Sequence, residues 1–378
     1  MGIFKRIKVR GILFTIVLLA IYCSCDNNTG QPMITSSQIV IDSLTIDTIS
    51  FDNQFCDIKL IPLENRYEAM LSYVPSMVVT DKWFIMLDER DNENVLLFDH
   101  DGKYHGNVGE VGHGHGEFNA VFDVTTDTAD NIYLLDFDKI LKYDLNGKYI
   151  QTLKSPLTHR LKNILCYNNG IIGASNYSGN KMLLHAFNNS LELQSEFLSS
   201  EGVTLGNPTY IQKSLQIKSD TLCYFNPYKS VFTLFNLNDL QPITQYILIS
   251  NKMRSIDITK EEEKSDVEIV DEITSYYLDN GKIVGDLIFN DKSYSLEIDI
   301  QNRKSTLKVK DGWFPQIYDI QDEWFYTFFE QDCLLDILHG KYRMSKESKS
   351  MLERAYEKMG REITEKDNFI IMKMKKKQ

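Results

Sequence analysis

Two adjacent stretches decide the fold, Val108-Gly-Glu-Val-Gly-His-Gly-His-Gly-Glu-Phe118 and Asp123-Val-Thr-Thr-Asp-Thr-Ala-Asp-Asn-Ile-Tyr-Leu-Leu-Asp136. The first is a glycine-rich connection, and the second has the alternation of a β-hairpin with a polar turn. The chain then continues into Ile140-Leu-Lys-Tyr-Asp-Leu-Asn-Gly-Lys-Tyr149, which predicts a second hairpin over an Asn-Gly turn. Four short strands that follow a glycine-rich loop are typical of one blade of a β-propeller.

The same pattern recurs along the chain. Leu97-Phe-Asp-His-Asp-Gly-Lys-Tyr104 aligns with Lys142-Tyr-Asp-Leu-Asn-Gly-Lys-Tyr149 at an offset of 45 residues (144 − 99 = 45). Weaker copies lie at 185–193, 234–239 and 296–303. A period of about 40–50 residues is the range of propeller blades, which stack around a ring because one sheet cannot cover both of its faces.

These repeats predict an all-β, six-bladed β-propeller. The first five blades are expected near residues 74–108, 118–153, 163–197, 210–249 and 273–309, and the sixth starts near residue 314. One C-terminal helix, at 345–359, is inserted in the last blade, because its apolar residues form a single stripe and Gly360 follows it. A strand at 368–375 should return, and a strand at 55–63 should join the same blade and close the ring.

The end of the chain alternates apolar and basic residues in Lys373-Met-Lys-Met-Lys-Lys-Lys377. Lysines of this kind protect exposed sheet edges from pairing with other chains. The pattern therefore predicts an edge strand with protective lysines, rather than a tail that binds a ligand.

The N-terminus has the pattern of a processed targeting segment. Four basic residues up to Arg10 precede a short apolar run, which ends at Ser24 and Cys25. A small residue before a cysteine resembles a bacterial lipoprotein signal, in which the cysteine is lipidated after cleavage. We therefore expect a signal peptide at 1–24, lipidation of Cys25, a flexible tether at 25–37 and the propeller at 38–378. An ordinary signal peptide or a short anchor helix are the alternatives.

Charge and cysteine content exclude several classes of function. Loss of residues 1–24 removes four basic residues and no acid, so the formal charge moves from −12 to −16 (−12 − 4). Nucleic-acid binding is not expected for so acidic a chain. Cysteines at 56, 166, 223 and 333 lack metal-ligand spacing and are interpreted as small buried residues. Their disulfide status stays open.

The chain resembles the six-bladed β-propeller lipoproteins of Gram-negative bacteria, which are distant relatives of the NHL-repeat propellers. The resemblance rests on the lipobox-like start, Ile58-Lys-Leu-Ile-Pro-Leu-Glu64, the glycine-rich element at 109–118, the Phe-Asp-x-x-Gly-Lys turns and Asp367-Asn-Phe-Ile-Ile-Met372. It implies a propeller held in the cell envelope by lipid, in the outer membrane. The resemblance implies no common activity.

The glycine-rich loop is the first candidate for a binding site, since it should connect the outer strand of blade one to the inner strand of blade two. His113, His115 and Glu117 would then face a ligand. The alternative, which we favour, is that the glycines form a structural crossing, Glu117 caps a turn and both histidines are exposed. Without a following helix, this loop is not a phosphate site.

Acidic and aromatic residues supply the other candidates. Asp88, Asp123 and Asp136 stand at strand ends in blades one and two, where they would bind calcium or, as we favour, hydrogen-bond turns. Trp313 and Tyr228 could stack on a sugar or pack against a peptide, although strand aromatics more often pack in the core. No catalytic elbow or zinc-protease motif is present in the sequence.

Two functions from different classes follow. The first is a non-catalytic binding or scaffolding module for a glycan, peptide or protein, with no cofactor and no metal site. The second is an NHL-like hydrolase or lyase with Ca²⁺ or Zn²⁺ in the central channel. The sequence does not identify the ligand, the oligomeric state or the side of the membrane on which the protein lies.

Overall fold

The computed structural model describes residues 34–44, 46–89, 94–168, 170–175, 181–200, 213–227, 229–249, 273–289 and 292–377. The chain divides after Thr35, and the unit Ser36–Gln378 carries the fold. The predicted targeting segment and Cys25 lie outside the described residues.

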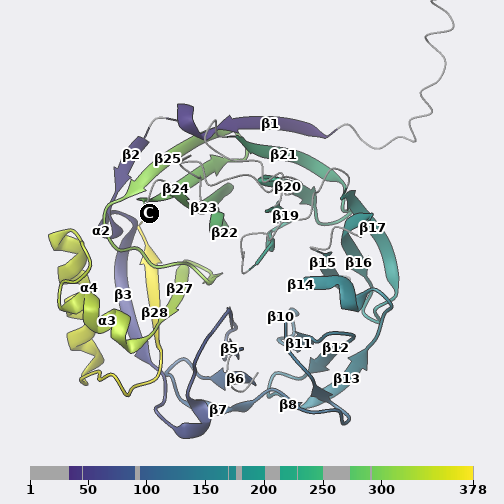
Figure 1. Cartoon of the computed structure of the whole chain (residues 1–378), viewed down its shortest axis with the longest axis horizontal. Coiled ribbons are helices and arrows are strands. Elements are labelled where there is room, and N and C mark those ends of the chain that lie inside the picture. The colour runs from purple at the N-terminus through teal and green to yellow at the C-terminus, as the bar shows by residue number, and fades with distance from the viewer. Residues whose placement is uncertain are drawn as a thin grey trace, which may run out of the picture. The chain divides into compact units, whose positions relative to one another are not determined.

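Six mainly antiparallel sheets follow one another around a ring (Figure 1). Each of the first three blades is a meander of four consecutive strands, ordered from the centre outward. Blade one has β4 (Ser76–Val79), β5 (Phe84–Asp88), β6 (Asn94–Phe98) and β7 (Tyr104–Asn107); blade two has β10 (Asp123–Thr126), β11 (Ile132–Leu135), β12 (Ile140–Tyr143) and β13 (Tyr149–Leu153); blade three has β14 (Leu161–Tyr167), β15 (Gly170–Ser175), β16 (Met182–Phe187) and β17 (Leu193–Ser199).

Blades four and five each carry a fifth, outermost strand from the N-terminal segment. Their meanders are β18 (Leu215–Lys218), β19 (Thr221–Asn226), β20 (Val231–Asn236) and β21 (Pro242–Ile249), then β22 (Ile273–Asp279), β23 (Lys282–Phe289), β24 (Lys292–Asp299) and β25 (Lys304–Lys310). β1 (Thr35–Val40) lies beside β21, and β2 (Ile46–Ile49) pairs in parallel with β25. The short 3-10 turn Ile41–Ser43 separates β1 from β2.

Blade six joins the two ends of the chain, as predicted. Its order is β26 (Asp319–Gln321), β27 (Trp324–Phe329), β28 (Ile370–Lys376) and β3 (Phe55–Pro62). β28 pairs antiparallel with β27 on one side and with β3 on the other, with Ile371 opposite both Phe328 and Ile61. The closing strand is therefore interior to its sheet, and the prediction of an edge strand was wrong.

Two helices, where one was predicted, separate β27 from β28. The predicted helix is α4 (Lys346–Met359), which begins at Ser345, whose side chain accepts the N–H of Ser348, and ends at Gly360 with φ 77°. A second helix, α3 (Gln331–Leu338), directly follows β27. Both lie on the outside of blade six (Figure 1), where they pack with the short helix α2 (Phe51–Gln54) in one apolar cluster.

The core consists of apolar layers between successive blades, because alternate residues of a strand point to opposite faces of its sheet. In β5, Phe84 and Met86 pack toward blade six, whereas Ile85 and Leu87 pack toward blade two. Every blade thus buries both faces, which explains why no single blade is stable alone. Within the described ranges, no helix is long and apolar enough to span a membrane.

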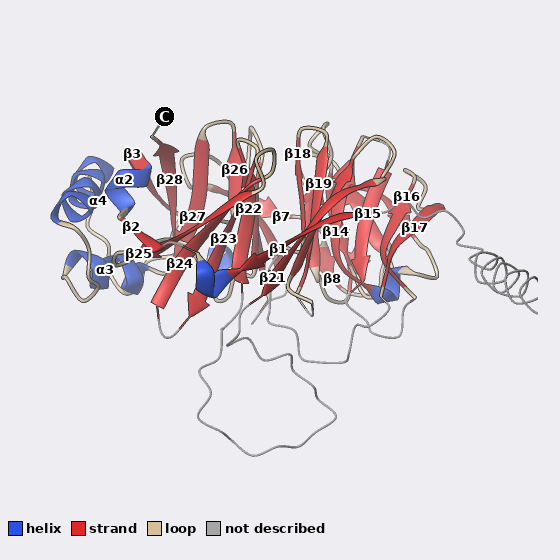
Figure 2. Cartoon of the chain, turned by 90° about the horizontal axis from the view of Figure 1, so that it is seen from above, coloured by secondary structure: helices blue, strands red, loops and turns tan. Residues whose placement is uncertain are grey.

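Each blade has four strands that alternate in direction from the centre outward, apart from the added outer strands β1 and β2. All six innermost strands therefore run in the same direction. The connections between blades therefore lie on one face, together with the turns that join the second and third strands. We call this the crossover face. The lower side of the ring in Figure 2 is this face, where the short strand β8 (Glu110–Val111) of the glycine-rich loop lies.

Candidate functional site

The glycine-rich loop connects β7 of blade one to β10 of blade two, as predicted, and therefore belongs to the crossover face. Within the loop, β8 pairs in parallel with β9 (Glu117–Phe118). Gly116 has φ 80°, and an added Cβ would lie 2.7 Å from Cγ of Tyr149. The Tyr143 hydroxyl donates to the carbonyl of Gly116 over 2.9 Å. The loop is thus packed onto the outer strands of blade two.

The carboxylate of Glu117 turns back into its own loop. Its Oε2 accepts the N–H of Gly114 over 2.7 Å, and a Cβ on Gly112 would clash with the same oxygen. His113 and His115 are exposed, and the His115 ring meets Tyr149 edge-on at 4.6 Å between centroids. The carboxylate therefore stabilises the turn, while both imidazoles remain accessible to solvent.

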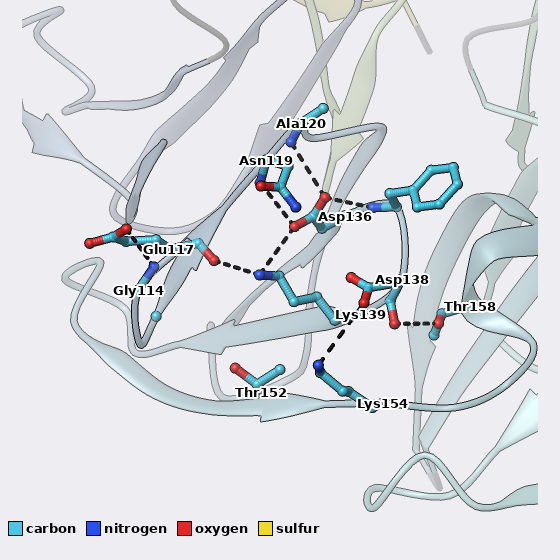
Figure 3. Close-up of polar contacts among 12 residues, drawn as sticks. Gly114, Glu117, Asn119, Ala120, Asp136, Asp138, Lys139, Thr152, Lys154 and Thr158 are labelled. Atoms are coloured by element: carbon cyan, nitrogen blue, oxygen red, sulfur yellow. Dashed lines mark hydrogen bonds and ion pairs between the residues drawn. The ribbon is translucent and has the colours of Figure 1, made fainter. Parts of the chain in front are cut away.

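A buried ion pair braces the base of this loop (Figure 3). The carboxylate of Asp136, fully buried, accepts backbone N–H groups from Asn119 at 3.0 Å, Ala120 at 3.4 Å and Phe137 at 2.6 Å. Lys139 lies 3.4 Å from Asp136 Oδ2 and also donates to the carbonyl of Glu117 over 2.8 Å. One carboxylate thus fixes the end of the glycine-rich loop and the β11–β12 turn together.

Blade one contains the same device. Asp88 accepts N–H groups from Ser72 and Tyr73, and also the Ser72 hydroxyl, at 2.9–3.2 Å. Asp88 ends the second strand of its blade and Asp136 directly follows the second strand of its own, and both hold the segment that leads into the first strand. Their carboxylates are used by these backbone groups, as the turn interpretation predicts.

The braced turns expose aromatic side chains on the crossover face. Phe137, on the turn after β11, is 62% exposed, and Phe122, before β10, is 39% exposed. The N–H of Phe122 donates to the carbonyl of Leu135 over 2.8 Å, so the backbone of Phe122 lies beside the end of β11, two residues before Phe137. Nζ of Lys162 lies 5.1 Å above the Phe122 ring. Sequence analysis missed this pair, although a phenylalanine between two aspartates in a turn was a visible signal.

The other aromatic candidate that the structure describes, Trp313, does not lie on this exposed surface. Trp313 packs against Phe51 and Phe329, with ring centroids at 6.1 and 5.9 Å, in the apolar cluster of blade six and its helices. Tyr228 lies outside the described residues. The structure therefore groups His113, His115 and Glu117 in one loop and places Trp313 in another layer of the ring.

The central channel carries a second polar region. Asp123 on β10 accepts the N–H of Ile164 on β14 over 2.9 Å, and its other oxygen accepts the N–H of Val124. Asp319 on β26 does the same with Val79 of β4 and with Ile320, at 2.7 and 2.8 Å. Each carboxylate thus links the innermost strands of two neighbouring blades.

Burial raises the pKa values of these two carboxyl groups. Desolvation raises the pKa of Asp123 to about 6, against the lowering effect of its hydrogen bonds and of Lys213. Desolvation also raises the pKa of Asp319, and the charges of Lys213 and Lys218 oppose this rise. The ammonium group of Lys213 therefore acts on carboxylates of blades two and six.

Two hollows that share the lining residues Gln216 and Tyr276 lie beside these groups, the wider one between blades four, five and six and the narrower one reaching blade one. The wider one has a volume of about 80 Å³, and Gln216, Lys218, Tyr277 and Asp319 are among its lining residues. The narrower one, about 10 Å³, is reached by Ser76 and Lys213. Its size suits a single oxygen-sized group, whereas the wider hollow has room for more.

Metal ligands do not gather in the part of the chain that the structure describes. There, no group of three or more His, Cys, Asp or Glu side chains could hold a metal ion. The cysteines at 56, 166, 223 and 333 are free thiols; Cys223 is buried and Cys56 exposed.

Solved structures show which folds the chain is similar to. A protein of Bacteroides fragilis described as exported has 14% sequence identity and a TM-score of 0.66, over 92% of this chain and all of that one. The extracellular domain of a one-component system of B. thetaiotaomicron (13%, TM-score 0.41) matches 67% of this chain and 32% of its own. The WD40 domain of Pan2 from Neurospora crassa (10%, TM-score 0.43) matches 81% of this chain and 76% of its own.

The family of the chain follows from a match over almost its whole length. No curated protein matches it. The family model described as "Domain of unknown function (DUF4934)" matches residues 37–375, a range that covers all six blades except for the first two residues of β1 and the last residue of β28. The chain therefore belongs to the DUF4934 family, and its fold is a six-bladed β-propeller.

Proposed function

We propose that the protein is a lipid-anchored propeller of the Gram-negative envelope that binds a glycan or peptide on its crossover face without catalysis. The anchor is proposed from the basic, apolar, Ser24-Cys25 order of the N-terminus. The exported Bacteroides protein with the similar fold supports an envelope location. The kinship with NHL-repeat propellers is part of the same proposal.

The observation that carries the binding proposal is the rigid presentation of Phe137. A largely exposed aromatic ring gains nothing from the core, yet the turn beneath it is held by the carboxylate of Asp136 and by Lys139. Aromatic groups held rigidly lose little entropy when a partner binds, and they dominate the energetics of many interfaces. Phe122 and the exposed His113 and His115 extend the surface on the same face.

A binding screen tests this function. The full chain should bind members of a glycan array or a peptide library with affinities of about millimolar to micromolar, as expected for a shallow site. Phe137→Ala with Phe122→Ala should remove that binding. Tyr342→Ala, at an exposed aromatic between α3 and α4, is the matched control and should bind normally. Binding that survives the loss of both phenylalanines would refute the assignment of the site.

The anchor is tested separately. Metabolic labelling with a fatty-acid analogue should label the wild-type chain, and Cys25→Ala should release an unlabelled, soluble protein. Label that persists in Cys25→Ala would show that Cys25 is not the anchor, whatever the propeller binds.

A further inference from the structure

Lys213 joins opposite sides of the ring. It precedes β18 of blade four, yet its Nζ donates to the carbonyl of Met77 on β4 of blade one over 3.1 Å. In a ring of six, blades one and four face each other across the centre. The ammonium group therefore lies within the channel, where it acts on Asp123 and Asp319 from the two flanking blades.

The two carboxylates are engaged by hydrogen bonds at the junctions between blades, although Asp319 also lines the wider hollow. Asp123 accepts three donors, from Val124, Ile164 and Asn163, and Asp319 accepts two backbone N–H groups. Both side chains thus serve the junctions between blades, and they compensate part of the lysine charge. Lys218, which lines the wider hollow, adds a second positive charge.

Unused hydrogen-bond donors converge on the narrow hollow. The hydroxyl of Ser76 is 5% exposed and has no hydrogen-bond partner among the described residues, an arrangement that costs free energy unless something else satisfies it. The Lys213 ammonium has three N–H donors, of which Met77 takes one. The hydroxyl and the ammonium therefore face the same small space with donors to spare.

We propose that this part of the channel binds a carboxylate group, with one oxygen between Ser76 and Lys213 and the rest of the ligand in the wider hollow. Carboxylates are among the acceptors that charged N–H donors bind most strongly. The carboxylate could belong to a uronic acid or to the C-terminus of a peptide. This site is separate from the Phe122–Phe137 surface, and it goes beyond the proposed function.

Isothermal titration of the full chain tests the proposal with four probes: glucuronate, glucose, a short peptide with a free C-terminus and the same peptide amidated. Glucuronate or the free peptide should bind at least tenfold more tightly than its uncharged counterpart. Preference within the first pair identifies a uronate site, and preference within the second identifies a C-terminus site. Equal affinity within both pairs, or no saturation by any probe, overturns the proposal.

Variants locate the site. Lys213→Gln, which keeps a donor for Met77 but loses the charge, should weaken the preferred carboxylate probe at least tenfold. Ser76→Ala should weaken it severalfold, and it serves as the second variant if Lys213→Gln does not fold. Lys366→Gln, at an exposed lysine in the loop before β28 and outside both proposed sites, is the control and should leave binding unchanged. Carboxylate binding that both channel variants retain would place it elsewhere and overturn the assignment.

Discussion

Blade two and blade six have the same architecture but opposite origins. Blade two comes from one continuous stretch, β10 to β13, whereas blade six combines β3 from the beginning of the chain with β26, β27 and β28 from its end. Yet each blade is joined to the next one by the same kind of contact, an aspartate carboxylate that accepts a backbone N–H from the neighbouring innermost strand. Asp123 reaches Ile164 across 41 residues of sequence, and Asp319 reaches Val79 across 240. The ring is thus closed by an ordinary junction, and only the length of chain between the partners differs.

The largest expected effect is on the composite blade. Deletion of residues 368–378 removes β28, and β27 and β3 then lose their common partner and the apolar layers on both sides. We expect the free energy of unfolding to fall by several kcal/mol, measured by urea denaturation. Lys366→Ala, at an exposed loop residue just before the deletion, should behave as wild type. An unchanged urea midpoint in the deletion variant would show that β28 does not take part in closing the ring.

The second-largest effect is expected in blade two, which comes from one continuous stretch of sequence. Asp136→Ala leaves three backbone N–H groups and the ammonium of Lys139 without their acceptor in a buried place. A loss of about 3 kcal/mol is expected. Lys154→Ala, which removes only a distant 4.0 Å pair between exposed side chains, is the control. If Asp136→Ala costs no more than Lys154→Ala, the brace beneath Phe137 contributes nothing to stability.

The pH dependence of the free energy of unfolding tests Asp123 and Asp319, the carboxyl groups at these two junctions. The folded pKa of Asp123, about 6, exceeds the unfolded value of about 4, so the folded state binds the proton more tightly. Stability contributed by Asp123 is therefore present below pH 4 and is lost as the pH rises to 6, by about 2–3 kcal/mol. The raised pKa of Asp319 acts in the same sense.

Loss of the lysine charge should enlarge this dependence. Lys213→Gln removes a charge that lowers both pKa values, so the fall in stability should extend above pH 6. Urea midpoints at pH 4 to 8 measure it, with Lys162→Gln as the control. Identical pH profiles for wild type and Lys213→Gln would show that the ammonium does not act on these carboxyl groups.

The smallest effect is expected at the glycine-rich loop. His113→Ala with His115→Ala removes two exposed rings and one edge contact with Tyr149, so stability should change by less than about 0.5 kcal/mol. Gly116→Ala, at φ 80° and against Tyr149, should cost about 1–3 kcal/mol in the same loop. Thermal melts of the two variants compare accessible side chains with the backbone that carries them. A larger loss of stability in the histidine variant than in Gly116→Ala would show that the histidine side chains, and not the backbone at Gly116, stabilise the loop.

The sequence predicted the ring because its signals are local. Each hairpin shows its alternation and turn within about 45 residues, and the glycine-rich loop was placed correctly between β7 and β10. The eight-residue helix α3 was missed because it directly follows the aromatic strand β27 and is too short for a clear period. The lysines of β28 suggested an edge, but Lys373 extends over the Trp324 ring and Lys375 pairs with Glu323.

The candidate site was harder to predict than the fold. Asp136 and the glycine-rich loop are close in sequence, and their spacing was visible. By contrast, Lys213 has its partners on three other blades, at Met77, Asp123 and Asp319, and no spacing rule links such positions. Site geometry in a propeller channel arises from ring closure, so it is absent from any single repeat.

The N-terminal strands β1, β2 and β3, each outermost in its blade, affect the order in which the ring can be completed. β1, β2 and β3 all lie before residue 63, whereas their partners β21, β25 and β28 begin at residues 242, 304 and 370. These strands, of 6, 4 and 8 residues, therefore have partners far along the chain, and contacts this distant in sequence form slowly. Because β28 is the C-terminal strand and pairs with both β27 and β3, the ring closes only when this last strand is in place.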